Sequence, residues 1–454
     1  MSDAIKNNIK RAREYTSMEL SSALKPWRQV TLYKRQHSFV LPQFELEQKH
    51  LAHQQSEEEA ALHEYRNRIN EYEQGLTNGK NWEYYKKVVN PYELVYTQKK
   101  YDNFPESICT LKPLSRSYFK MLEIFDIIQF RNMFPWDEPI KSAHVCEGPG
   151  GFIEALFDEA YRDGRRVQTS IAMTLRSSQT NVPGWKRASQ FLQKNRNIKI
   201  IYGEDNTGNI LKASNQQYFI DYSTNAKYGG KVHLFTADGG FDFSCNYENQ
   251  EQLIFPLLIA STKIGLEVLK PGGVFVLKLF DFYQKSTTDL LYFLSLHFQE
   301  WTLYKPAMSR PCNPEQYFIG KGFLGCSDEV LDVMRVWCSM VEHAQPVEYL
   351  YKAEYPHDFQ KMLEKLRTNS FESQIAYLEW VFFLIDRNDE QLEQQFLRRN
   401  EKTSQEWCER FHVPISLSYY PSAEESHTCP PISGPQSPRP DAGKDDPLPC
   451  GPAL

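Results

Sequence analysis

The sequence lacks three patterns that would each indicate a particular class of protein. Its nine cysteines form no Cys-x-x-Cys pair, and no cluster of His and Cys has the spacing of zinc ligands. Such usage is typical of a reduced intracellular protein without a metal site. The N-terminus has no apolar core of a signal peptide, and no run of about 18 apolar residues could span a membrane. We therefore expect a soluble protein with neither metal nor membrane attachment, in the nucleus or, alternatively, the cytoplasm.

An excess of one charge is also missing from the chain as a whole. The formal net charge of −6 argues against a wholly basic nucleic-acid coat, although a local basic groove is still compatible with it. The first forty residues differ, because eight Lys or Arg residues stand against three acids and give a local charge of +5 (8 − 3). This segment could contact phosphates or form a solvated helical surface, and the sequence leaves both open.

Alternating strands and helices fill the middle of the sequence. Apolar runs predict seven strands, at 143–147, 167–174, 198–202, 232–237, 272–279, 300–305 and 315–320. The segments between them predict helices at about 151–162, 185–195, 208–217, 250–268 and 284–297. This alternation predicts an α/β fold with a doubly wound, mostly parallel sheet covered by helices on both faces. In such sheets ligands bind beyond the carboxyl ends of the strands, near the topological switch.

Helical patterns flank the predicted sheet on both sides. Helices are predicted before it at 45–74 and 114–133, and after it at 328–344 and 358–400. From about residue 422 the chain is rich in Pro, Ser, Gly and Asp and poor in large apolar residues, so we expect disorder there.

A glycine-rich turn follows the first predicted strand and leads directly into a helix. Its order of strand, turn and helix places glycines where the backbone must approach a bound molecule closely. The helix N-terminus offers free N–H groups to polar ligand atoms, and Glu147 can accept hydrogen bonds from a ligand amine or hydroxyl. The candidate binding residues are Glu147, Gly148, Pro149, Gly150 and Gly151. Turns of this kind also occur for reasons of chain geometry alone.

The ends of the second and third strands narrow the choice of ligand. The dinucleotide fingerprint places an acid that binds ribose hydroxyls after the second strand. The segment Met173-Thr174-Leu175 has no acid, which argues against NAD(P) and leaves Thr174 or the backbone as a ribose contact. After the third strand, Asp205 or Glu204 could reach an adenine amino group, with Asp205 as our candidate. An ordinary turn rich in Asp, Asn and Gly is the alternative.

Four ionisable residues occupy positions at strand ends, or on the helix before the first strand, where a residue without an ionisable group is usual. They are Lys120, Asp238, Lys278 and Glu315. Lys278 is the most informative, because it interrupts an apolar strand and a buried lysine costs several kcal/mol unless it is paired. One carboxylate neighbour would explain simple pairing. Two lysines and two carboxylates at one strand end indicate a reactive site and not only a structural ion pair. Lys120 and burial would both lower the pKa of Lys278 and suit it to act as a base towards a hydroxyl.

These motifs together resemble a known family. The four ionisable residues, the turn at 147–152 and the Lys-Pro-x-x-Ser-Arg segment at 305–310 are similar to those of the FtsJ-like RNA ribose 2′-O-methyltransferases, more closely the Adrift type. The resemblance covers roughly residues 90–322. It implies a seven-stranded Rossmann-like methyltransferase sheet and S-adenosylmethionine as the cofactor. It also implies a Lys-Asp-Lys-Glu catalytic tetrad made of Lys120, Asp238, Lys278 and Glu315.

The resemblance also implies a substrate and a domain plan. It predicts methylation of a cap-proximal nucleotide of mRNA, and the Adrift type favours a nucleotide beyond the first, in a cap-2 or hypermodified cap. A methyltransferase of ribosomal or other structured RNA and a non-catalytic cap- or RNA-binding module are the alternatives. The expected plan is a basic, helical N-terminal region (1–100), the methyltransferase domain (101–325), a helical C-terminal region (326–420) and a disordered tail (421–454).

Overall fold

The fold is known from a computed structural model, and the chain as far as Ile415 forms one compact unit. The residues that the structure describes are 5–7, 26–28, 30–35, 55–75, 80–97, 104–178, 182, 184–228, 230–240, 250–342, 347–350 and 354–416. Most of the basic N-terminal segment, the first part of the helix predicted at 45–74 and the tail at 421–454 lie outside these residues.

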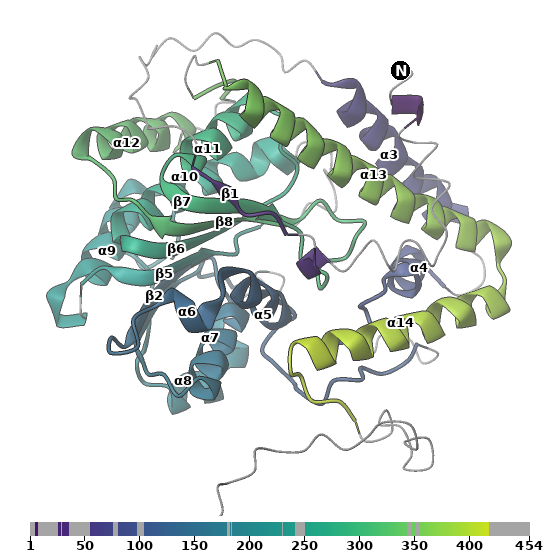
Figure 1. The fold of residues 1–454 in the computed structure, drawn as a ribbon, viewed down its shortest axis with the longest axis horizontal. Helices are drawn as coiled ribbons and strands as arrows, with labels where there is room; N and C mark the ends of the chain where they lie inside the picture. The colour runs from purple at the N-terminus through teal and green to yellow at the C-terminus, as the bar shows by residue number, and fades with distance from the viewer. Residues whose placement is uncertain are drawn as a thin grey trace, which may run out of the picture. The chain divides into compact units, whose positions relative to one another are not determined.

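The centre of the fold is a single mixed sheet (Figure 1). Its strands lie in the order β1-β7-β8-β6-β5-β2-β3-β4. The strands are β1 (Tyr33–Lys34), β2 (Ile140–Val145), β3 (Val167–Met173), β4 (Ile198–Ile201), β5 (Val232–Ala237), β6 (Leu269–Leu279), β7 (Phe298–Tyr304) and β8 (Gln316–Phe323). The block β6-β5-β2-β3-β4 is parallel, whereas β8, β7 and β1 pair in antiparallel fashion. The doubly wound, mostly parallel α/β sheet is therefore confirmed.

The predicted count of seven strands is wrong, because the sheet has eight. The extra strand, β1, has only two residues, and they pair with Trp301 and Glu300 of β7. Two residues are too few to give a period-two pattern, so the sequence carries no signal for this strand.

Helices surround the sheet and extend beyond it. The described α-helices of four or more residues are α3 (Glu57–Gly75), α4 (Trp82–Val89), α5 (Ser117–Ile128), α6 (Phe130–Met133), α7 (Gly151–Arg162), α8 (Ser189–Lys194), α9 (Ala213–Thr224), α10 (Gln250–Val268), α11 (Lys285–Ser295), α12 (Asp328–Glu342), α13 (His357–Arg387) and α14 (Glu390–Arg410). In Figure 1, α5, α7 and α8 lie on one side of the sheet and α9 to α12 on the other. A large core cluster lies on the α10 side, where Phe235, Phe275 and Phe318 of the sheet are fully buried.

Two long predicted helices are each divided in the structure. The segment predicted as one helix at 358–400 forms α13 and α14. Asn388 adopts a left-handed conformation (φ 44°), and the Asp389 side chain caps α14 by accepting from the backbone N–H groups of Gln391 and Leu392. A left-handed residue ends a helix, and an aspartate cap begins the next one. The segment predicted at 114–133 is divided in the same way at Gln129 (φ 56°).

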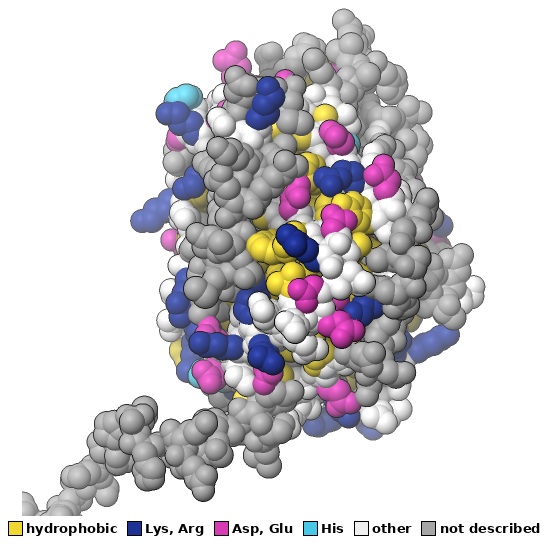
Figure 2. All heavy atoms as spheres, turned by 90° about the vertical axis from the view of Figure 1, so that its right-hand side faces the viewer, with side chains coloured by type: hydrophobic (Ala, Val, Ile, Leu, Met, Phe, Trp, Pro, Cys, Tyr) yellow, Lys and Arg dark blue, Asp and Glu magenta, His cyan; other side chains and the backbone are white. Residues whose placement is uncertain are grey.

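The outer helices present a mixed surface. Figure 2 shows the right-hand side of Figure 1, where the described Lys and Arg side chains alternate with Asp and Glu around small apolar patches. Of the basic N-terminal residues, Lys6, Arg28, Lys34 and Arg35 lie in described segments; the first three are exposed and Arg35 is partly buried. No described helix is both long and apolar enough to cross a membrane.

Candidate active site

The turn after β2 is held closed by a buried carboxylate. Gly150 (φ +105°) caps α7, and the carboxylate of Glu147 accepts from the Phe152 backbone N–H at 2.8 Å. The Thr236 hydroxyl lies 3.4 Å from the other Glu147 oxygen. Burial, reinforced by the charge of Asp238, raises the pKa of Glu147 well above its usual range. With only 2% of its surface exposed, Glu147 supports the shape of the turn from beneath.

The glycine at the start of α7 permits a close approach of another helix. A Cβ atom on Gly151 would lie 2.3 Å from the hydroxyl oxygens of both Ser115 and Ser117, beside the first turn of α5. Any larger residue would therefore push α5 away from the turn. The turn and α5, which carries Lys120, are thus fitted to one another.

The predicted ribose and adenine contacts lie beside this turn, at the ends of β3 and β4. Thr174 is buried directly after β3, and a Cβ on Gly208 would lie 2.0 Å from its carbonyl oxygen. Asp205 accepts hydrogen bonds from Lys212 at 2.5 Å, from the Thr207 hydroxyl at 2.6 Å and from the Asn215 amide at 2.8 Å. These partners, Lys212 foremost, lower the pKa of Asp205. Its carboxylate therefore orders this loop, and its contact with adenine stays a prediction.

The four ionisable residues meet as two ion pairs. Lys120 Nζ on α5 lies 2.6 Å from Glu315 Oε1, and Lys278 Nζ on β6 lies 3.2 Å from Asp238 Oδ1. All four side chains are between 12% and 15% exposed. The two pairs are coupled, because the charge of Glu315 also acts on Lys278. The structure thus brings together all four residues selected from the sequence.

Strand register explains this convergence. In the parallel pair β5/β6, Ala237 is opposite Leu277, so the next residues, Asp238 and Lys278, are neighbours. In the antiparallel pair β6/β8, Lys278 is opposite Tyr317. Side chains two positions apart on a strand share a face, which places Glu315 on the side of Tyr317.

Tyr317 is a site residue that was not among the catalytic candidates taken from the sequence, although it belongs to the segment Glu315-x-Tyr317 that resembles the family. Its hydroxyl donates to Asp238 Oδ1 at 2.8 Å, and its ring lies 6.0 Å from the Lys120 ammonium. Burial, with the charges of Asp238 and Glu315, raises the pKa of Tyr317 well above its usual range, so the hydroxyl stays a donor. The available signal was its period-two spacing from Glu315 on a buried strand.

The electrostatics of Lys278 overturn one expectation. Burial lowers the pKa of Lys278, but the charges of Asp238 and Glu315 raise it further, and the net pKa is above the ordinary lysine value. The predicted lowering is therefore wrong. Burial raises the pKa of Glu315, but Lys120 and Lys278 lower it to about 2. The formal charges of the two lysines and the two acids cancel.

The lysine with a lowered pKa in this region is Lys305, directly after β7. Burial lowers its pKa to about 8. Its ammonium donates to the carbonyl oxygen of Glu315 at 3.1 Å and to that of Asn313. Lys305 therefore ties down the loop that leads to Glu315. Among the described residues, no group of three or more His, Cys, Asp or Glu side chains could hold a metal ion.

The part of the chain that carries this site is similar in sequence to known methyltransferases. The FtsJ-like methyltransferase family matches residues 113–323. The chain is 32% identical over 218 residues to the cap-specific mRNA (nucleoside-2′-O-)-methyltransferase 1 of Dictyostelium discoideum, covering 45% of this chain and 28% of that protein. It is 29% identical over 260 residues to the cap-specific mRNA (nucleoside-2′-O-)-methyltransferase 2 of Drosophila melanogaster, covering 53% of this chain and 36% of that protein. The chain thus spans about a third of the length of these curated relatives.

The edge of the sheet beside the glycine turn suits the binding of a cofactor. The glycine turn after β2 leaves no room for side chains between α5 and α7, and the loops after β3 and β4 lie at the same edge of the sheet. Ligands of doubly wound sheets bind at this edge, next to the strand where the order reverses, which here is β2. Residues 113–323 of this chain therefore match the FtsJ-like methyltransferase family, and this edge of the sheet is where its methyl donor, S-adenosylmethionine, would bind.

Proposed function

We propose that this protein transfers a methyl group from S-adenosylmethionine to the ribose 2′ hydroxyl of a cap-proximal nucleotide in mRNA. The observation that carries the proposal is the pair of coupled ion pairs, Lys120–Glu315 and Lys278–Asp238, at the edge of the sheet where the glycine turn lies. A cluster of two ammonium groups suits a weakly acidic hydroxyl that must become a nucleophile. The names of the relatives support RNA caps as the substrate.

The bound cofactor would supply a methyl group that its sulfonium already activates. Lys120 and Lys278 would donate hydrogen bonds to the 2′ oxygen and stabilise the charge that develops there. Asp238 and Glu315 would hold the two ammonium groups in place, and Tyr317 would fix Asp238. Because the pKa of Lys278 is raised, this lysine would steer the hydroxyl as an ammonium. Methyl transfer would proceed in the fraction of molecules in which the Lys278 amine is neutral and takes the 2′ proton, while the oxygen bonds to the methyl carbon and the carbon–sulfur bond breaks.

The target nucleotide is a finer part of the proposal. The resemblance to the Adrift type favours a nucleotide beyond the first, in a cap-2 or hypermodified cap, and such a role in mRNA processing would place the protein in the nucleus. Single-stranded RNA ends suit such a site, because they can enter a cleft and the 2′ hydroxyl distinguishes them from DNA.

Transfer of a tritiated methyl group to defined transcripts tests the proposal. The substrates are an uncapped RNA, the same RNA with a guanosine cap, and that RNA already methylated on its first nucleotide. We expect incorporation on the capped RNAs, and nuclease mapping should place it on the second nucleotide. Incorporation on structured ribosomal RNA alone would favour the ribosomal alternative. No incorporation on any RNA, with the cofactor bound, would favour a non-catalytic RNA-binding module.

A further inference from the structure

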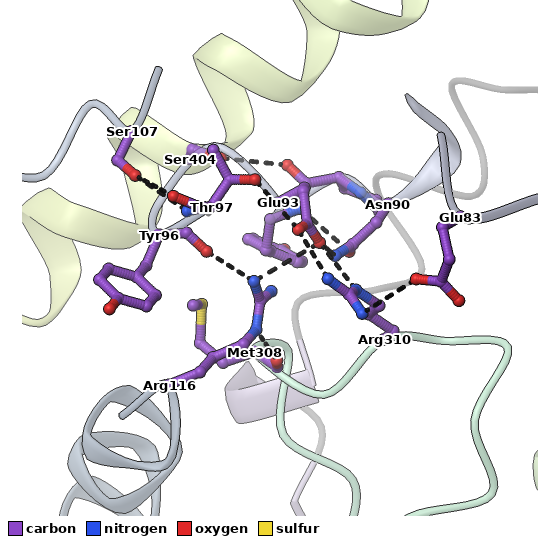
Figure 3. A network of polar contacts seen from close by, with 12 residues as sticks. Glu83, Asn90, Glu93, Tyr96, Thr97, Ser107, Arg116, Met308, Arg310 and Ser404 are labelled. Atoms are coloured by element: carbon purple, nitrogen blue, oxygen red, sulfur yellow. Dashed lines mark hydrogen bonds and ion pairs between the residues drawn. The ribbon is translucent and has the colours of Figure 1, made fainter. Parts of the chain in front are cut away.

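Glu93, a fully buried carboxylate outside the family-matched segment, contacts two arginines. One precedes the helix that carries Lys120, and the other lies in the loop that carries Glu315. Glu93 follows α4, has no exposed surface, and lies 20 residues before the first matched residue, 113. Figure 3 shows its side chain between the guanidinium groups of Arg116 and Arg310. Arg310 donates to both Glu93 oxygens, from Nε at 3.1 Å and from Nη2 at 3.0 Å. Arg116 Nη1 lies 3.5 Å from Glu93 Oε2.

Each arginine has further polar partners. Arg116 donates to backbone carbonyl groups, and Arg310 lies near a second carboxylate. Arg116 donates to the carbonyl oxygens of Met308 and Tyr96, both at 2.7 Å. Arg310 Nη1 lies 3.7 Å from Glu83, whose side chain is 39% exposed. The Asn90 amide donates to Glu93 Oε2 at 2.8 Å. The two guanidinium groups outweigh burial and lower the pKa of Glu93 to about 2, so the carboxylate stays charged.

The two arginines lead directly to the Lys120–Glu315 pair. Arg116 is the N-cap residue of α5, and Lys120 lies four residues later, one turn along the same helix face. Arg310 belongs to the loop that reaches Glu315 five residues later. One carboxylate therefore connects the helix that carries the lysine with the loop that carries its partner.

We propose that Glu93 is a positioning residue for methyl transfer, which sets the approach of Lys120 to Glu315 by holding Arg116 and Arg310 together. This inference rests on the proposed function, because Lys120 and Glu315 matter as a reacting pair only if the domain transfers a methyl group. The dependence is geometric. A displacement of about 1 Å at a reacting group can cost on the order of a hundredfold in rate.

Three variants test this role. Glu93→Gln removes the charge and Glu93→Asp keeps it but shortens its reach. Glu83→Gln is the matched control, because it removes an exposed carboxylate from the same arginine. We expect Glu93→Gln to lower kcat by roughly ten- to a hundredfold, Glu93→Asp to lower it less, and Glu83→Gln to leave it near wild type. KM for RNA should change by less than about threefold, since the proposal concerns alignment and not uniform binding. If Glu93→Gln fails to fold, Glu93→Asp decides.

The pH profile separates positioning from general structural support. Glu315 faces the charges of Lys120, Lys278, Lys305 and, at longer range, Arg116, together with the Tyr317 ring. With Lys120 in place, the pKa of Glu315 is about 2, so its titration should not affect kcat/KM down to pH 4. Moving the Lys120 ammonium away should raise that pKa towards its ordinary value. The kcat/KM of the Glu93 variants should then fall below about pH 5.

A second readout is independent of activity. Lys120 is 12% exposed beside Glu315, so an amine-reactive ester should label it slowly in the wild type and faster in both Glu93 variants, as followed by peptide mass spectrometry. The proposal would be overturned if both Glu93→Asp and Glu93→Gln kept three wild-type properties. These are the value of kcat, the dependence of kcat/KM on pH below 5 and the rate of Lys120 labelling. A lower kcat without either of the other two changes would also overturn it. A wild-type protein that methylates no RNA would refute the proposed function, while the labelling would still decide the role of Glu93.

Discussion

Replacing Tyr317 with phenylalanine removes a single oxygen atom from the centre of the site. The hydroxyl donates to Asp238 Oδ1 at 2.8 Å, the same oxygen that lies 3.2 Å from Lys278 Nζ. The ring itself packs 5.8 Å from that of Phe152 and should stay in place. The substitution therefore removes one of the two contacts to Asp238 Oδ1 without opening a cavity.

The size of the effect follows from the type of bond that is lost. A hydrogen bond to a charged group contributes about 1.5–3 kcal/mol. If this energy acted wholly on the transition state, the rate would fall roughly 10- to 150-fold. Because Lys278 still holds Asp238, we expect the lower end, about a tenfold loss of kcat. Affinity for the cofactor should be nearly unchanged.

Single-turnover methyl transfer at saturating cofactor and RNA measures this prediction. Tyr65→Phe is the matched control, because its hydroxyl also donates to a carboxylate, Glu379, at 2.7 Å, between α3 and α13. In an Asp238→Asn background the effect of Tyr317→Phe should shrink, because both changes act on the same contact. Turnover by Tyr317→Phe within about twofold of wild type, or an equal loss in Tyr65→Phe, would refute the reasoning.

Three further outcomes follow from the structure. Lys278→Ala should abolish methyl transfer while calorimetry shows S-adenosylmethionine affinity near wild type, and wild-type-like turnover would contradict the proposed mechanism. Gly151→Ala should weaken cofactor binding, because its Cβ would lie 2.3 Å from Ser115 and Ser117, whereas Gly184→Ala, with nothing within 4 Å, should not. Burial raises the pKa of Glu123 to about 7 despite four donors, so the folded state binds its proton more tightly than the unfolded chain does. Its stabilising contribution is complete below about pH 4.5 and is lost as pH rises to 7, by roughly 3 kcal/mol; urea unfolding should show Glu123→Gln gaining stability relative to wild type over that range.

The sequence predicted the elements that repeat a pattern and missed those that depend on one contact. Asp238 and Lys278 could be selected because a charged residue at the end of an apolar run is recognisable from the sequence alone. The two-residue β1 and the break at Asn388 have no such pattern. Tyr317 was not a catalytic candidate because an aromatic residue on a buried strand needs no explanation until its hydroxyl is seen beside Asp238.

The error in the pKa of Lys278 has a similar origin. The sequence indicates that a lysine is buried and that a second lysine belongs to the same site, and both facts favour a neutral amine. It does not give the distances to Asp238 and Glu315, and those carboxylates decide the sign. At Lys305, whose ammonium donates to two backbone carbonyl groups, burial outweighs the charge of Glu315 and lowers the pKa to about 8.

The helices outside residues 113–323 contact α5 and the segments that follow β6 and β7. Trp407 of α14 donates to Glu123 on α5 at 3.1 Å, and the same carboxylate accepts from the backbone of Ala307 and Met308. After β6, Arg66 of α3 lies 2.9 Å from Asp281, with both side chains under 10% exposed.

Arg367 of α13 donates to the carbonyl oxygen of Phe282 at 2.7 Å. Together with Glu93, these contacts reach α5 and the loops that follow β6 and β7. Removing one partner of a buried charge pair typically costs about 3–5 kcal/mol, because the other is left uncompensated. The contacts lie on the segments that carry Lys120, Lys278 and Glu315, so the geometry of the site depends on parts of the chain that the family match does not include.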